Sequence, residues 1–236
     1  MRRIPLWSSA FFLFCYLCIM EQNNIIALTE NFVRETLKGA EGGHDWFHIE
    51  RVWRLAKRIA VAENAYLLVV ELAALLHDIA DAKFNGGDET EGAAKADRFL
   101  RSIEINDSVR EHVVQIINNV SFKGGNAAQS FHSPELDVVR DADRLDAIGA
   151  IGIARTFNYG GFKNRPLYDP EIKPRPGLSP EEYRQHVAPT LNHFYEKLLL
   201  LADGMKTKTG RQMAAGRHAF MEEYLRRFYA EWDGVE

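Results

Sequence analysis

The chain has 236 residues, 46% of them hydrophobic and 26% charged, which is enough to bury a full core as one domain. A formal net charge of −4 provides no overall positive field, so we expect no nucleic acid partner. Both cysteines, Cys15 and Cys18, lie among the first twenty residues, which excludes a disulfide framework or a thiolate metal site from the rest of the chain.

Residues 1–20 differ in composition from all that follows. Arg2 and Arg3 precede an apolar run over residues 10–20, as in a signal peptide, but no small-residue cleavage site follows. The run is shorter than the roughly 20 residues of a membrane-spanning helix. We favour Met20 as the true start, with residues 21–236 as one domain in a cytoplasmic protein without a stable membrane partner. A genuine signal at residues 1–20 would instead make the protein membrane-associated or exported.

The remainder shows helical periodicity in one segment after another, with no alternating strand pattern and no internal repeat. Asp45 is a candidate N-cap, and residues 159–179, rich in proline and glycine, are expected to form an ordered surface loop or a lid. We therefore expect an all-α, single-domain helical bundle. The predicted helices cover residues 24–38, 45–64, 71–81, 88 or 90 to 100, 106–120, 134 to about 154, 180–202 and 207–232.

The helix predicted over residues 71–81 carries the first chemical signal. Its leucines recur at helical spacing, and His77 and Asp78 stand together near its C-terminal end. Neighbouring side chains on a helix point about 100° apart, so only a ligand lodged at the helix end can meet both. A divalent cation suits this donor pair, because His nitrogen and Asp oxygen together bind Mn, Fe, Ni, Zn or Mg. For an isolated dipeptide, a helix cap or a salt bridge is the alternative.

Other short motifs accompany this dipeptide in a fixed order. They are His48-Ile-Glu-Arg-Val, then His77-Asp78, then Asp141-Ala-Asp-Arg-Leu-Asp146, with the flanks Gly43-His-Asp-Trp-Phe-His48 and Asp143-Arg-Leu-Asp-Ala-Ile-Gly-Ala-Ile-Gly152. The set resembles the HD superfamily of metal-dependent phosphohydrolases, and its flanks resemble a small single-domain bacterial branch. The similarity runs from about Asn23 to Gly234. It implies four metal ligands, His48, His77, Asp78 and Asp143, around one divalent ion whose identity stays open.

The resemblance also implies a reaction. Two imidazoles and two carboxylates leave positions of an octahedral ion free for water and a substrate oxygen. A metal ion lowers the pKa of such a water molecule and polarises a phosphoryl group. We therefore expect a phosphoric ester hydrolase that attacks phosphorus with metal-activated water. Its substrate would be a nucleotide or another small phosphorylated molecule.

Four neighbouring residues are candidates for contacts with the substrate. Arg51 lies one turn after the predicted ligand His48 and can hold a phosphate, although a salt bridge to a nearby carboxylate fits equally well. Family members often carry an acid three residues after the HD pair, which assigns Asp81 a catalytic role; a solvated helix-end carboxylate is its alternative. Lys83 is a candidate phosphate contact. His44 is a candidate substrate residue or a part of the helix entry.

The acids around Asp143 cannot all meet one ion at their spacing. We expect Asp146 to support a ligand from behind or to pair with Arg144, and Asp141 to lie at the surface or cap a helix.

Two alternatives to the single-metal hydrolase remain. A di-iron HD-type oxygenase would need His112 and His132 beside the other ligands, whereas these histidines also suit a core edge and a surface loop. A nucleotide-sensing binding module is the other alternative.

Overall fold

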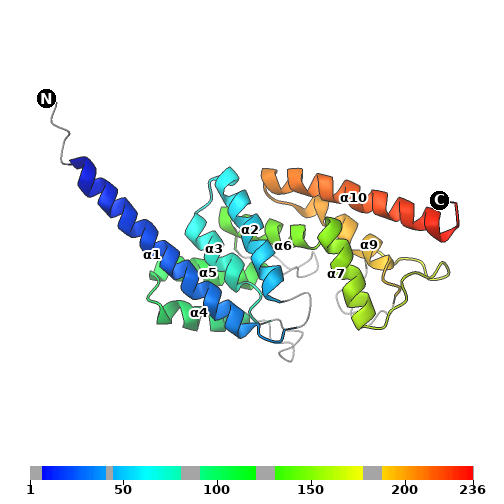
Figure 1. The fold of residues 1–236 in the computed structure, drawn as a ribbon, viewed down its shortest axis with the longest axis horizontal. Helices are drawn as coiled ribbons and strands as arrows, with labels where there is room; N and C mark the ends of the chain where they lie inside the picture. Colours follow the sequence, from blue (N-terminus) through cyan, green and yellow to red (C-terminus); the bar gives the residue numbers. More distant parts are fainter. Residues whose placement is uncertain (1–6, 41–44, 81–90, 121–130, 178–187, 236) are drawn as a thin grey trace.

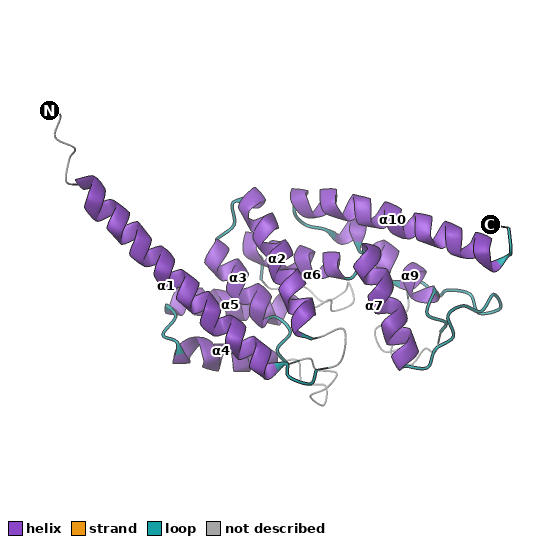
Figure 2. Cartoon of the chain, viewed as in Figure 1, coloured by secondary structure: helices purple, strands orange, loops and turns teal. Residues whose placement is uncertain are grey.

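The computed structural model describes residues 7–40, 45–80, 91–120, 131–177 and 188–235, with only the helical path over residues 7–19. Every regular element in these ranges is helical, which confirms the all-α single-domain prediction (Figures 1 and 2). The elements are α1 (Trp7–Thr36), α2 (Trp46–Glu63), α3 (Leu67–Leu76), α4 (Glu91–Ser102), α5 (Asp107–Val120), α6 (Pro134–Asp146), α7 (Gly149–Phe162), α9 (Asn192–Glu196), the 3₁₀ turns η1 (Leu198–Leu200) and η2 (Ala202–Gly204), and α10 (Lys208–Trp232).

Helix α3 is the centre of the core. Residues 69–76 are all buried, and a helix that is apolar around its whole circumference must be covered on every side. Helices α1, α2, α5 and α6 provide that cover. The helix stops at His77, which is its C-cap, so the His77–Asp78 pair lies where the core ends and the surface begins.

Helix α2 lies between α3 and α6 and contacts both. The Asp45 side chain accepts a hydrogen bond from the backbone N–H of His48, 3.0 Å away, which confirms the predicted N-cap. The same first turn therefore fixes the backbone of His48. The buried stripe of α2 turns that imidazole inward, towards α6.

The helix predicted from residue 134 to about residue 154 is in fact two helices. Helix α6 ends at Asp146, Ile148 is extended, and α7 begins at Gly149 with a φ of +75°. This left-handed conformation favours glycine, and a Cβ atom there would lie 3.0 Å from the Cβ of Arg217. The apolar periodicity wrongly predicted one continuous helix, because Ile148, Ile151 and Gly152 keep the same spacing across the break.

The long helix predicted over residues 180–202 is also wrong for the part that the structure describes. After loop and turn residues 188–191, the chain forms the short α9, followed by η1 and η2. The N–H groups of Thr190 and Leu191 donate to the carbonyls of Pro166 and Leu167, at 2.8 and 3.0 Å, and so tie this segment to the preceding loop. The loop predicted over residues 159–179 is confirmed over residues 163–177, but its predicted start is wrong because residues 159–162 belong to α7.

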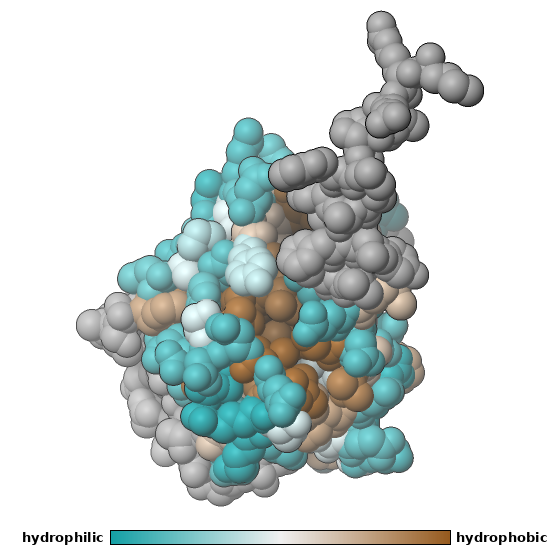
Figure 3. All heavy atoms as spheres, turned by 90° about the vertical axis from the view of Figure 1, so that its left-hand side faces the viewer, coloured by the Kyte–Doolittle hydropathy of each residue, from teal (hydrophilic) through white to brown (hydrophobic). Residues whose placement is uncertain are grey.

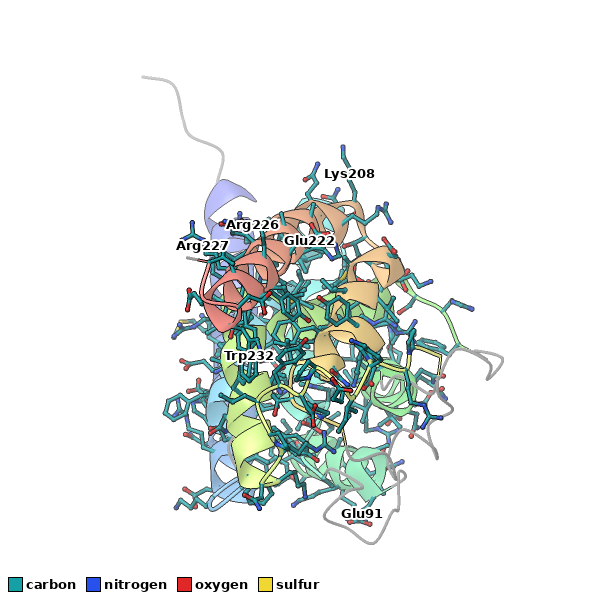
Figure 4. The ribbon with its side chains drawn as sticks, turned by 90° about the vertical axis from the view of Figure 1, so that its right-hand side faces the viewer. Glu91, Lys208, Glu222, Arg226, Arg227 and Trp232 are labelled. Carbon is teal, nitrogen blue, oxygen red and sulfur yellow. The ribbon has the colours of Figure 1, made fainter. Side chains whose placement is uncertain are left out.

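Helix α10 confirms the predicted final helix, with Thr207 as its N-cap. Arg226 and Arg227 pair with Glu223 on its outer side, while Trp232 packs against Tyr168 (Figure 4). At the other end of the molecule, the N-terminal part of α1 projects beyond the body (Figure 1). Seen from this end of the molecule, apolar residues gather in the middle of the face (Figure 3). No helix in the described ranges is both long enough and apolar enough to cross a bilayer.

Candidate metal centre

Side chains from α2, from the end of α3 and from α6 meet at one point. The Nε2 atom of His48 lies 3.6 Å from Asp143 Oδ1 and 3.9 Å from Asp78 Oδ2. The Nε2 atom of His77 lies 3.8 Å from the same Asp143 oxygen. His48, His77 and Asp78 each offer a ligand atom within 4.8 Å of the other two. The structure thus brings together all four residues that the sequence proposes as ligands.

The His77 imidazole is oriented by its own helix. Its Nδ1 lies 2.9 Å from the carbonyl oxygen of Ala74 and must carry the proton for that hydrogen bond. This arrangement directs the Nε2 atom towards the carboxylates. Nε2 is buried, and within the described residues it has no hydrogen-bond partner. A buried nitrogen without a hydrogen bond is costly, and a metal ion at this point would satisfy it.

The charges around His77 favour a cation. Burial lowers the pKa of His77, but the Asp143 and Asp78 carboxylates and the Ala74 carbonyl together outweigh burial and raise the pKa to about 9. Burial raises the pKa of Asp143, but His77, His48 and Arg155 outweigh it and hold this pKa well below its usual range. A site that retains a proton so firmly also attracts a metal ion, which would replace that proton.

The imidazole of His48 is oriented by a carboxylate, whereas that of His77 is oriented by a backbone carbonyl. Its Nδ1 lies 2.8 Å from Asp146 Oδ2, and both side chains are almost fully buried. Burial lowers the pKa of His48, which favours the neutral ring. Burial raises the pKa of Asp146, but hydrogen bonds from His48 and Arg51 and the charge of Arg155 hold it at about 2. The charged carboxylate can only accept, so Nδ1 of His48 carries a proton, and in the neutral ring the Nε2 lone pair faces Asp143 and Asp78.

Two arginines neutralise Asp146. Arg51 donates through Nε at 2.6 Å and Nη2 at 3.0 Å, and Arg155 of α7 donates through Nη1 at 2.5 Å. The support predicted for Asp146 is confirmed, whereas Arg144 instead donates to the carbonyl of Gly204. Sequence reasoning missed Arg155 because nothing in its neighbourhood marks it, and only the break before α7 brings it back to the end of α6.

The structure corrects the prediction for Asp141 in part. Its side chain is fully buried, so it does not lie at the surface. It accepts hydrogen bonds from the N–H groups of Lys206 and Thr207 and from the Thr207 hydroxyl, which fastens the start of α10 to α6. The capping alternative therefore describes it better. The capped backbone lies some 65 residues away in sequence, beyond the reach of local patterns.

The candidates for substrate contact are only partly visible. Arg51 forms the salt bridge that was its alternative assignment, and its role in phosphate binding stays a prediction. His44, Asp81 and Lys83 lie outside the described residues.

The two further histidines required by a di-iron site are engaged elsewhere. His112 Nε2 lies 2.9 Å from Ser133 Oγ and 3.5 Å from Glu135 Oε2, and His132 is exposed. Both line a separate pocket that includes Arg110. In the described part of the chain, the group suited to a metal ion includes neither histidine.

The distances between the donor atoms fit one ion. With bonds of about 2.1 Å, adjacent ligands of an octahedral ion lie about 3.0 Å apart and opposite ligands about 4.2 Å, while tetrahedral ligands lie about 3.4 Å apart. The observed separations of 3.6, 3.8 and 3.9 Å fall within this range. Among the described residues, the group whose ligand atoms all lie within 4.8 Å of one another contains His48, His77 and Asp78, and Asp143 is close to the two histidines. Two nitrogens with two carboxylates suit Mn, Fe, Ni or Zn.

Comparisons with known proteins agree with this geometry. Residues 46–148 match the HD domain family model. The YpgQ protein of Bacillus subtilis is 35% identical over 87% of this chain and 92% of its own length. Its crystal structure in complex with ADP covers 89% of this chain and 96% of that chain, with a TM-score of 0.69. An HD-superfamily hydrolase of Bacillus thuringiensis is 40% identical, covers 90% of this chain and 98% of that chain, and has a TM-score of 0.73. The chain therefore belongs to the HD-domain superfamily.

Proposed function

We propose that the protein is a metal-dependent phosphohydrolase that acts on a nucleotide or another small phosphorylated molecule. The observation that carries this proposal is the orphaned Nε2 of His77. It is buried, it faces carboxylates, and its hydrogen bond through Nδ1 orients it for an ion. The similarity to HD-superfamily hydrolases supports hydrolysis as the reaction. The ADP complex of YpgQ supports a nucleotide as the substrate class.

His48, His77, Asp78 and Asp143 would hold one divalent ion. When bound, this ion would supply an acidified water molecule and a Lewis acid for a phosphoryl oxygen. The chain's own residues orient the site: Ala74 and Asp146 fix the two imidazoles with Nε2 facing inward. Ion pairs with Arg51 and Arg155 keep the Asp146 carboxylate ionised. The ionised carboxylate holds the imidazole of His48 in its orientation.

Arg51 and Asp81 complete the proposal. The Arg51 side chain is 32% exposed, so its guanidinium can meet a phosphate oxygen at the edge of the site while still paired with Asp146. Asp81, three residues after the ligand Asp78, is proposed to position the water molecule or to protonate the leaving group.

The test combines metal analysis with an activity screen. Purified protein should contain close to one divalent ion per chain and should hydrolyse nucleotides in the presence of Mn or Mg. His77→Ala should lose both the ion and the activity. The matched control is His112→Ala, a histidine in the separate pocket, which should lose neither. Activity in metal-free His77→Ala, or an equal loss of metal in both variants, would defeat the proposal.

A further inference from the structure

Arg155 marks the face of α7 that contacts the residues behind the candidate metal centre. This residue reaches Asp146, which in turn holds His48. Tyr159 and Phe162 follow at positions i+4 and i+7, so they lie on the same stripe of the helix, further from the centre. At a rise of 1.5 Å per residue they stand about 6 and 10 Å along the helix from Arg155.

This stripe does not belong to the core. The opposite side of α7 packs inward: Phe157 lies against Phe194 and Tyr224, and Gly160 is so close to Thr190 that a Cβ atom would overlap its side chain. Tyr159 is 39% exposed and Phe162 64% exposed, with ring centroids 6.4 Å apart. Two neighbouring exposed aromatic rings on the stripe of α7 that begins at Arg155 form a surface on which a flat ligand can stack.

Helix α2 carries a similar feature on the other side of Asp146. Arg51 binds the same carboxylate, and Phe47, one turn earlier on the stripe of Arg51, is 63% exposed. In Figure 1 the N-terminal end of α2 and the C-terminal end of α7 both lie on the lower side of the molecule, to either side of α6.

Positive charge surrounds the rings on α7. Lys163 Nζ lies 4.9 Å from the centroid of Phe162 and 5.6 Å from that of Tyr159, and the Arg165 guanidinium lies 5.9 Å from the centroid of Tyr159. These cations repel a positively charged aromatic ligand and favour one that carries phosphates. A nucleotide combines a flat base, a sugar as spacer and an anionic end.

We propose that Tyr159 and Phe162 form the stacking surface for the base of a nucleotide whose phosphates lie at the metal centre. This inference rests on the proposed function and narrows its substrate class to nucleotides. The metal centre would act on the phosphate, while the α7 aromatic residues would select for a base. Stacking of this kind does not depend on which base is present, because every base has a flat aromatic face.

Equilibrium binding tests the inference independently of turnover. ADP and pyrophosphate, which lacks a base, are titrated by calorimetry into the full chain with bound Mn. Phe162→Ala should weaken ADP binding roughly 5- to 100-fold, the usual loss for one stacked base, and leave pyrophosphate binding unchanged. Phe162→Trp should restore ADP binding. The matched control is Tyr66→Ala, an aromatic residue at the start of α3 that is 51% exposed, and it should change neither ligand.

Several outcomes would overturn the inference: unchanged ADP binding in Phe162→Ala, equal weakening of ADP and pyrophosphate, or a change in oligomeric mass without an effect on ADP. These outcomes are distinct from failure of the proposed function, which is a lack of hydrolysis by the wild-type protein. If the wild-type protein binds ADP through Phe162 without hydrolysing any phosphoester, the stacking surface is upheld and the hydrolase proposal is lost.

Discussion

Asp146→Asn tests how strongly the support of His48 controls metal binding. The carboxylate accepts one hydrogen bond from His48, two from Arg51 and one from the side chain of Arg155. An amide has only one oxygen. If that oxygen faces the arginines, the amide N–H₂ meets His48 Nδ1 and forces the ring proton onto Nε2, where it blocks metal binding. If the oxygen faces His48, the N–H₂ group meets two guanidinium donors.

The magnitude follows from these contacts. Loss of a carboxylate behind a ligating histidine typically weakens metal binding 10- to 100-fold. Removing one partner of a buried ion pair costs about 3–5 kcal/mol of unfolding free energy, and the exposure of Arg51 and Arg155 reduces this to about 2–3 kcal/mol. The side chains of these arginines are 32% and 25% exposed, so water solvates part of the charge left behind.

The assay pairs metal titration with denaturant unfolding, and Asp141→Asn is the matched control. Asp141 is an equally buried carboxylate on the same helix, but it binds the start of α10 instead of a ligand. Both variants should lose stability, and only Asp146→Asn should lose metal affinity. Equal metal affinity in the two variants would refute the role assigned to Asp146.

Three further predictions follow from the site and the fold. Asp81→Ala should retain metal and helix content while turnover falls roughly 10²–10⁴-fold, and unchanged turnover would reduce Asp81 to a surface carboxylate. In metal-free protein, the raised pKa of His77 contributes stability that is complete below about pH 6.5 and is lost as the pH rises through about 9. Metal affinity should rise over the same pH window with release of one proton, which calorimetry in different buffers measures. Metal affinity that is independent of pH would contradict this prediction. Gly149→Ala should lower the free energy of unfolding by about 1–3 kcal/mol. This loss should exceed that of Gly177→Ala, because Gly177 also has a positive φ but no neighbour within 4 Å. Equal losses would show that the contact with Arg217 contributes nothing.

The sequence predicted those parts of the structure that local patterns encode. Apolar periodicity predicted α2 and α5, and the helical spacing of Leu72, Leu75 and Leu76 marked a core helix, although α3 ends at Leu76 and not at the predicted residue 81. The ordered His and Asp motifs selected four side chains that the fold brings together. The sequence did not predict the role of Arg155 or the partners of Asp141, because both depend on contacts between residues far apart in the chain. The break at Gly149 escaped because its cause is a backbone conformation rather than hydrophobicity.

Helix α6 presents three carboxylates in six residues, and each of them connects to a different part of the molecule. Asp143 faces the candidate ligands His48 and His77, Asp146 joins α2 to α7, and Asp141 holds the start of α10. The segment that matches the HD family model ends at residue 148, so Arg155 and Thr207 both lie beyond it. A fragment cut at that boundary would leave Asp141 without Lys206 and Thr207, and Asp146 without one of its two arginines. The half that matches the HD family model and the C-terminal helices should therefore unfold in a single cooperative transition.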